Sequence, residues 1–304
     1  MSRRGWVLFG AMCLLWGIPY LMIKIAVGGV SVPVLVFLRT GIGALVLLPL
    51  AFRPGALASL RAHWRPLLAF AGLEIIGPWY LLSDAERHLS SGLTGLLIAA
   101  VPIIGVLVAR GFGDTTRLGP MRWTGLGLGL AGVVLLAAPH LSGGTAWPVV
   151  ELLLVAVGYA TAPVIAARQL ADVPNLLMTA SCLGLAALVY AVPAALTWPT
   201  ALPSGPVLFS LGALAVVCTA LAFVLFFELI REVGPARAVV FTYVNPAVAV
   251  AAGVLLLGEP LTTAVVAAFV LILSGSVLAT ARQREKVPAA VVAQPCPALD
   301  SPAD

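Results

Sequence analysis

Ten long apolar runs, separated by short polar segments, set the pattern of this chain. Each run is close to the roughly 20 residues that an α-helix needs to cross the hydrocarbon core of a bilayer. The pattern therefore predicts an all-α integral membrane protein with ten transmembrane helices. We expect the spans at residues 5–28, 33–52, 66–83, 91–110, 119–138, 147–167, 175–197, 206–227, 236–257 and 261–281.

The composition excludes a soluble fold. Hydrophobic residues make up 61% of the chain and charged residues 10%, against about 45–50% and 25% in soluble domains. A soluble fold of this length has no way to bury so much apolar surface, so lipid must be its solvent. The run from Trp6 to Val27 is too long for a secretory signal peptide and is expected to be the first span. The cysteines form no CxxC pair and are expected to be packing residues.

The basic residues indicate orientation. With ten spans and a cytoplasmic N-terminus, fourteen of the 17 Lys and Arg residues fall in inner segments, one in an outer loop and two within spans. This positive-inside bias predicts cytoplasmic N- and C-termini. The pI of about 9.3 is therefore explained by topology, and we expect no nucleic-acid partner. Low Lys and high Ala and Arg content favours the inner membrane of a bacterium.

An internal repeat with an offset of about 144 residues relates the two halves. The matched positions at this offset are Pro19 and Pro163, Pro102 and Pro246, Lys24 and Arg168, Asp84 and Glu228, and Arg87 and Arg231. Each half has five spans, and because five is odd the second half enters the membrane from the opposite side. We expect two inverted five-helix repeats, at residues 1–140 and 141–281, followed by a disordered cytoplasmic tail at 282–304.

Several short motifs occur in the same order as in a known family. They are Trp16-Gly17, Phe37-Leu38-Arg39 with Gly41 and Pro49, Ser91-Gly92-Leu93 leading to Val101-Pro102, and Gly258-Glu259-Pro260-Leu261-Thr262. With these motifs the chain resembles the EamA group of the drug/metabolite transporter superfamily. The resemblance implies a basket of ten helices around a central cavity, with spans 5 and 10 packed outside. One departure is Gly113-Asp114-Thr115, which stands where the first copy of the last motif belongs.

Charged residues within spans are the first candidates for function, because insertion of each costs about 2.5–3.5 kcal/mol. Glu74 falls at the middle of the third span, where it must be protonated, paired or facing water. Glu74 either couples transport to protons or binds a substrate amine, or it makes a structural hydrogen bond that joins two helices. Arg39 is expected to pair with Glu74 or to hold a substrate carboxylate. We expect Lys24 to snorkel and Glu151 to be an ordinary interfacial carboxylate.

Four prolines inside spans predict helix breaks: Pro19, Pro102, Pro163 and Pro246. Breaks in matched positions of two inverted halves indicate a solute site, although kinks also shape the helix bundle. The aromatic and amide groups beside them are further candidates for the cavity: Trp16, Tyr20, Tyr159, Tyr243 and Asn245. Rings in spans more often face lipid, and Trp16 is the strongest exception.

Glycines at 125 and 129 form a small-xxx-small face in the fifth span, which predicts close helix packing and a candidate homodimer seam. No strand–loop–helix context surrounds them, so a dinucleotide cofactor is not expected. The three histidines, His63, His88 and His140, lie in or beside loops and do not cluster with acids, so no metal site is expected either.

The sequence favours an alternating-access transporter over other classes. We expect an exporter of a small metabolite, an amino-acid-like compound or a drug, with proton coupling as one mechanism and the two repeats rocking against each other. A passive pore or a membrane scaffold is the main alternative. An intramembrane enzyme is disfavoured, because no motif such as HExxH or GxSxG is present in the sequence.

Overall fold

The described part of the chain is helical throughout. A computed structural model describes residues 1–52, 54–113, 115, 118–142 and 146–280, and these contain no strand. The helices of the first half are α1 Arg3–Leu15, α2 Pro19–Ala26, α3 Val32–Ala51, α4 Ala56–Ala62, α5 Trp64–Ala71, η1 Gly72–Ile76, α6 Gly77–His88, α7 Ser91–Ile98, α8 Val101–Gly111 and α9 Pro120–Ser142. The helices of the second half are α10 Ala146–Gln169, α11 Asn175–Leu196, α12 Gly205–Gly212, η2 Ala213–Leu221, α13 Ala222–Val233, α14 Pro235–Ala238, η3 Val239–Tyr243, α15 Asn245–Leu257 and α16 Thr263–Thr280. The expected tail and Asp114 lie outside the described residues.

Nine of the ten expected spans are helices long and apolar enough to cross a membrane, among the residues that the structure describes. The ninth expected span, 236–257, is different because it is divided into α14, the 3₁₀ segment η3 and α15. Its longest helix, Asn245–Leu257, has 13 residues, fewer than a membrane span needs by itself. The third span is longer than expected and runs from Trp64 to His88.

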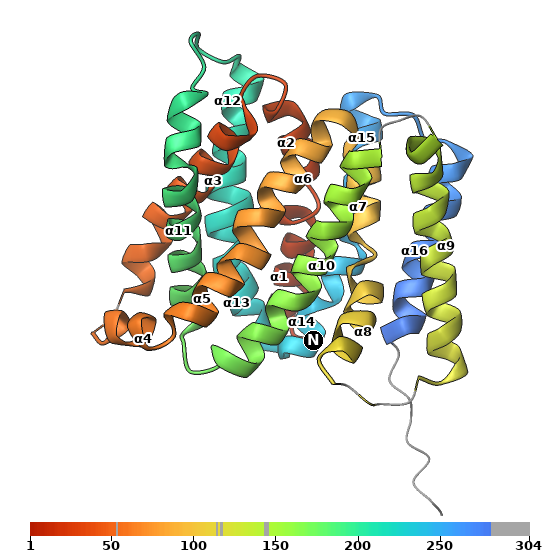
Figure 1. Ribbon diagram of the computed structural model, residues 1–304, viewed down its shortest axis with the longest axis horizontal. Coiled ribbons are helices and arrows are strands. Elements are labelled where there is room, and N and C mark those ends of the chain that lie inside the picture. The colour runs from red at the N-terminus through yellow and green to blue at the C-terminus, as the bar shows by residue number, and fades with distance from the viewer. Residues whose placement is uncertain (53, 114, 116–117, 143–145, 281–304) are drawn as a thin grey trace, which may run out of the picture.

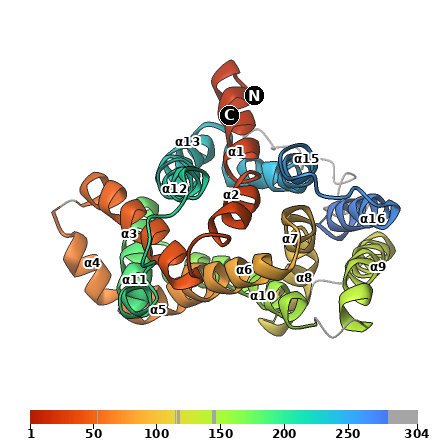
Figure 2. The same ribbon diagram turned by 90° about the horizontal axis from the view of Figure 1, so that it is seen from above.

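The helices pair across the two halves of the chain. The principal packed pairs are α3 with α11, α9 with α16, α6 with α10, α7 with α15 and α1 with α13. Each pair joins a helix of the first half, which ends with α9, to a helix of the second half, which begins with α10. The α9–α16 pair forms one edge of the molecule and α3 and α11 lie toward the other (Figure 1, Figure 2). Large apolar side chains such as Leu45, Leu188 and Leu255 are exposed on the periphery, as expected where lipid is the solvent.

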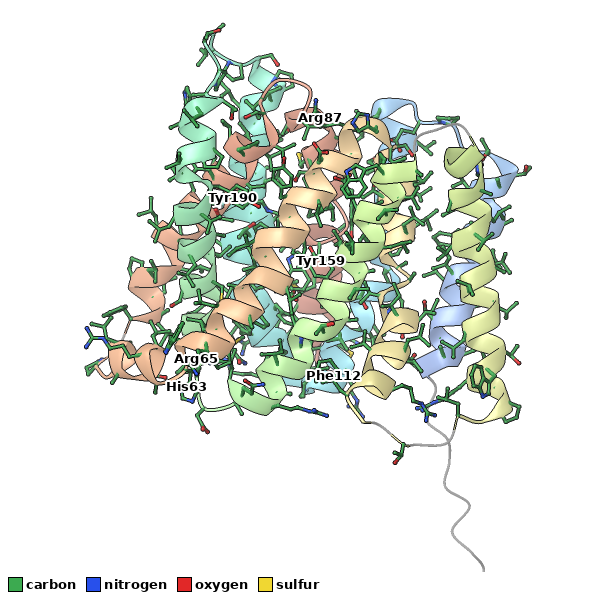
Figure 3. All side chains as sticks on the ribbon, viewed as in Figure 1. His63, Arg65, Arg87, Phe112, Tyr159 and Tyr190 are labelled. Atoms are coloured by element: carbon green, nitrogen blue, oxygen red, sulfur yellow. The ribbon has the colours of Figure 1, made fainter. Side chains whose placement is uncertain are left out.

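The bundle has two ends, each marked by labelled side chains in Figure 3. His63, Arg65 and Phe112 lie at one end, and Arg87 lies at the opposite end (Figure 3). The N-terminus lies on the side of Arg65 (Figure 1). We refer to these as the N-terminal end and the Arg87 end.

A π-helical segment occurs at the same place in both halves. The segment η1 spans Gly72–Ile76, and η2 spans Ala213–Leu221. Moving η1 along the chain by the 144-residue repeat gives 216–220, which lies within η2. A π-turn widens a helix by one residue and is frequent at functional sites. The hydroxyl of Tyr190 on α11 donates to the Ile76 carbonyl at the end of η1, over 2.8 Å.

The helices change course at three of the four candidate prolines. Pro19 begins α2, Pro102 lies in the first turn of α8, and Pro246 lies in the first turn of α15. At Pro163 the helix is not divided, because α10 continues through this residue. A glycine, Gly17, stands two residues before Pro19, and the matched position before Pro163 is Thr161. We attribute the difference to this glycine, since Gly destabilises a helix and Thr does so less.

The carbonyls at such breaks are not all free to bind a solute. Between α7 and α8, the Ala99 carbonyl accepts a hydrogen bond of 2.9 Å from the hydroxyl of Ser276 on α16. The chain thus satisfies this acceptor itself, as membrane proteins do where a transmembrane helix is interrupted.

The glycine face of the fifth span packs inside the chain. A Cβ atom added at Gly275 of α16 would lie 2.4 Å from the backbone nitrogen of Gly129, and one at Gly125 would lie 2.4 Å from the nitrogen of Ala279. Such backbone approach is what a small-xxx-small face permits. Because α16 of the same chain occupies this face, the predicted close helix packing is met within one chain, and the homodimer stays a prediction.

Candidate functional site

Arg39 on α3 is buried, with only 7% of its surface exposed. Its Nε donates to the hydroxyl of Thr219 in η2 over 3.1 Å, and its guanidinium carbon lies 3.7 Å from the centre of the Trp79 ring. The terminal amino groups have no hydrogen-bond partner among the described residues. Arg39 and Glu74 do not form the expected ion pair. The terminal amino groups of Arg39 therefore remain available to donate hydrogen bonds to a carboxylate.

Glu74 lies in the π-helical segment η1. Its Oε2 atom is buried and has no hydrogen-bond partner in the described part of the chain. It lies close enough to Tyr159 and Cys182 to act on them electrostatically. A Cβ atom at Gly158 of α10 would meet the Leu73 carbonyl at 2.4 Å, so only glycine lets α10 approach η1 this closely. Through this oxygen, Glu74 therefore does not form the hydrogen bond between two helices that a purely structural role requires.

Glu86 on α6 was not identified from the sequence. The residue is fully buried, and neither carboxylate oxygen has a hydrogen-bond partner among the described residues. An unpaired buried carboxylate is costly, so it holds a proton or binds a cationic group. The predicted third span ended at residue 83, which placed Glu86 in a loop. The sequence signal for a longer helix is a spacing of three and four residues between buried positions, at Trp79, Leu82, Glu86 and Leu89.

Lys24 has a structural role at the end of α6. Its Nζ donates to the Glu86 carbonyl over 2.6 Å and to the Leu89 carbonyl over 2.8 Å. A lysine in this place satisfies terminal carbonyls and complements the helix dipole. The ammonium of Lys24 thus reaches the Arg87 end of the bundle, and its partners there are backbone carbonyls.

The aromatic candidates divide into two groups. Tyr20 and Tyr159 lie within electrostatic range of each other and of Arg39, and Tyr159 is at mid-height of the bundle (Figure 3). Trp16 instead packs at centroid distances of 5.5, 4.9 and 5.4 Å against three phenylalanines, Phe223, Phe226 and Phe241. It belongs to a second apolar core between α1 and α13, so the prediction that Trp16 is a ligand platform finds no support in its contacts.

Tyr243 and Asn245 lie apart from Arg39. The Tyr243 hydroxyl shares a hydrogen bond of 2.8 Å with Thr280 at the end of α16. Asn245 is buried at the start of α15, and its Oδ1 has no hydrogen-bond partner in the described residues. We therefore define the central cluster as Tyr20, Arg39, Glu74, Trp79, Glu86 and Tyr159.

The central cluster combines a cation, two carboxyl groups and three rings. Tyr159 comes from the second half, and the other five members come from the first. Thr219 of the second half orients Arg39. Two cavities lie away from it, one of about 610 Å³ along α16 and one of about 280 Å³ between α8, α9 and α16. We therefore assign the candidate site from unpaired buried groups and not from a cavity.

The motif glutamate Glu259 closes the Arg87 end. Its carboxylate accepts hydrogen bonds from the Ser91 nitrogen at 2.7 Å, the Ser91 hydroxyl at 2.9 Å and the Gly92 nitrogen at 3.0 Å. These donors form the start of α7, where a negative charge stabilises a helix. Glu259 is thus a clamp between the α15–α16 connection and the first half of the chain.

Glu151 is not the ordinary interfacial carboxylate that its position suggested. It is only 2% exposed, and its Oε2 atom has no hydrogen-bond partner among the described residues. Glu151 lies in the second turn of α10, and α6, which packs along α10, covers this turn.

Comparison with known proteins agrees with the motifs. The model of the EamA-like transporter family matches the chain twice, over residues 3–138 and 146–281. The uncharacterized inner membrane transporter YedA of Escherichia coli K12 is 32% identical over 269 residues, which cover 84% of each protein. The uncharacterized transporter YvbV of Bacillus subtilis is 25% identical over 303 residues, or 95% of this chain and 96% of the relative.

The fold has also been seen in a crystal structure of another protein. That structure aligns with a TM-score of 0.65 and 23% sequence identity, over 92% of this chain and 98% of the other. At this identity the likeness concerns the fold alone. Together with its apolar helices, the two family matches identify a multi-pass membrane transporter, and the chain belongs to the EamA-like transporter family.

Proposed function

We propose that this protein is an alternating-access carrier built from two inverted five-helix repeats, with the segment from Pro235 to Leu257 as its ninth span. Three observations support the repeat: the double family match, the pairing of helices across the halves, and the π-helical segments at matched positions. In such folds the solute site lies between the repeats, and residues 1–140 rock against 141–281 around it.

The substrate is a small metabolite of the amino-acid type, or a drug with similar charges, and the direction is export. One observation carries this proposal: Arg39 and Glu86 are both buried in one cluster with free hydrogen-bonding groups. A zwitterion would place its carboxylate on the fork of Arg39 and its ammonium on Glu86. The rings of Trp79 and Tyr159 would pack against its apolar part.

The N-terminal end of the bundle faces the cytoplasm, and the protein resides in the inner membrane of a bacterium. The excess of basic residues on the segments at this end supports the orientation. The relative from Escherichia coli is described as an inner membrane transporter. Labelling of a cysteine placed in the segment 54–63 should succeed only after the membrane is made permeable. Labelling from outside intact cells would contradict the orientation.

A binding screen tests the substrate class. Purified protein is heated with zwitterionic metabolites and with matched derivatives in which the amine is acetylated or the carboxylate is amidated. We expect stabilisation by a zwitterion and its loss when either charge is blocked. Arg39→Gln should weaken binding at least about tenfold, because a charge-assisted bond contributes about 1.5–3 kcal/mol. The exposed Arg65→Gln is the control, and equal binding of both derivatives by the unchanged protein would exclude a zwitterion site.

Proton coupling is proposed at the carboxyl groups of the central cluster. Glu74→Gln should abolish proton-driven transport in liposomes and leave folding intact, because glutamine keeps the shape and cannot release a proton. Glu86→Gln should reduce transport of the ligand at every pH if Glu86 binds the substrate amine. Glu232→Gln, at the exposed N-terminal end, is the control. Unchanged transport and pH dependence in Glu74→Gln would remove Glu74 from the mechanism.

A further inference from the structure

The two ends of the bundle carry matching acid–base pairs on matching helices. At the N-terminal end Glu228 and Arg231 of α13 form an ion pair, and at the opposite end Asp84 and Arg87 of α6 form one with 3.1 Å between Nη1 and Oδ1. The pairs are separated by the 144-residue repeat. Each helix packs against the first helix of the other half, α13 against α1 and α6 against α10.

The partner from that neighbouring helix has opposite charge at the two ends. At the N-terminal end Arg4 of α1 reaches Glu228, with 2.8 Å between Nη2 and Oε2. At the Arg87 end the partner is Glu151 of α10, whose carboxyl group lies within hydrogen-bonding reach of Asp84. Asp84 of α6 therefore faces a second carboxyl group, that of Glu151, whereas Glu228 of α13 faces the cation Arg4.

The environment of Glu151 leaves one way to stabilise this contact. Glu151 is 2% exposed, and its Oε2 has no hydrogen-bond partner in the described residues. The groups placed against it are the Asp84 carboxyl and the Trp147 indole of its own helix, and Asp84 in turn pairs with Arg87. Two adjacent carboxyl groups repel each other when both are ionised, and they are stable when they share one proton.

We propose that Glu151 and Asp84 form a proton-binding site that holds α6 and α10 together at the Arg87 end. The protonated carboxyl group of Glu151 donates to the Asp84 carboxylate, which Arg87 neutralises from the other side. Loss of the proton leaves two negative charges in contact and drives the helices apart. The pair thus acts as a clasp that is closed at low pH and opens as pH rises.

This site is separate from the central cluster and needs no substrate to work. It extends the proposed alternating access, because closure of the Arg87 end would depend on the proton concentration there. Because the closed clasp binds a proton that the open clasp releases, linkage requires that acid favours closure. At the N-terminal end Glu228 lies between two arginines, so this contact needs no bound proton.

Hydrogen–deuterium exchange of the α10 segment 146–152 tests the clasp in the full-length protein in nanodiscs. After correction for intrinsic rates, we expect exchange about tenfold faster at pH 8 than at pH 5.5 in the unaltered chain. Glu151→Gln should stay protected at both values, because its amide donates to Asp84 regardless of pH. Asp84→Asn should also lose the pH response, and it provides an independent test at a more exposed position.

His88 supplies the matched control, since it is an exposed imidazole one turn after Asp84. His88→Gln should keep the full pH response of the unaltered chain. The proposal is overturned if the unaltered chain shows no pH response, if His88→Gln abolishes it, or if Glu151→Gln and Asp84→Asn both retain it. None of these results depends on a transport assay, so failure of the carrier proposal would be seen separately.

Discussion

The Arg87 end and the N-terminal end have the same helical framework and different chemistry. At the N-terminal end, Arg4 and Arg231 bracket the carboxylate of Glu228, and all three side chains are at least partly exposed. At the Arg87 end, a buried glutamate meets Asp84, while Glu259 and Lys24 fasten the neighbouring helix termini. In the proposed carrier these two ends act as gates, and their side chains decide how firmly and under which conditions each end closes.

The largest effect is expected when the Arg87 end is given the charge pattern of the N-terminal end. Asp84→Lys places a cation opposite Glu151, and the partly exposed position has room for the longer side chain. The contact then no longer needs a proton, so the gate should remain closed at every pH. We expect the transport rate in liposomes to fall about tenfold or more, which corresponds to about 1.4 kcal/mol or more. Arg87→Gln, which retains the acid pair, should keep pH-dependent transport, and full activity of Asp84→Lys would contradict the clasp.

An intermediate effect should distinguish the two matched basic residues Lys24 and Arg168. Lys24 donates to two carbonyls at 2.6 and 2.8 Å, whereas Arg168 makes an exposed contact of 3.3 Å with the Phe112 carbonyl. Lys24→Met should lower the unfolding free energy by about 1.5–3 kcal/mol, because it leaves α6 without charge-assisted bonds to its last carbonyls. Arg168→Met should change it by less than about 1 kcal/mol. Thermal unfolding of both variants in one detergent measures the difference, and equal losses would show that the two ends are fastened alike.

The smallest effect is expected at Arg4. Its side chain is 65% exposed, and surface ion pairs contribute about 0–1 kcal/mol and weaken with salt. Arg4→Gln should lower the melting temperature only slightly, and the difference should vanish at high ionic strength. A large loss that persists in high salt would mean that the N-terminal end depends on its ion pair more than its exposure suggests.

The main features of the fold could be predicted because lipid imposes a simple rule on the sequence. Apolar runs of about 20 residues become helices in a bilayer, and nine of the ten expected spans are such helices among the described residues. The ninth was harder, since a run that looks continuous is divided where Pro246 follows a 3₁₀ turn. The π-helical segments were not predicted at all, because no single residue in Gly72–Ile76 marks them and tertiary packing decides whether the extra residue is accommodated.

The candidate site was predicted only in part, for related physical reasons. Glu74 and Arg39 were found because a charge inside an apolar run is conspicuous. Glu86 was missed because it follows polar residues at the end of a span, where a helix and a loop look alike in sequence. Trp16 was given a functional role because aromatic residues in spans are ambiguous, and only the three phenylalanines packed around it reveal its place in a core.

The most direct test of the carrier mechanism is a counterflow measurement. Liposomes containing the protein are loaded with the unlabelled ligand from the binding screen and are diluted into a trace of labelled ligand. An alternating-access carrier should accumulate label transiently above equilibrium, with saturation, and Arg39→Gln should lose this overshoot. Entry of label that is linear in concentration, without overshoot and unaffected by Arg39→Gln, would contradict the carrier and indicate a passive pore.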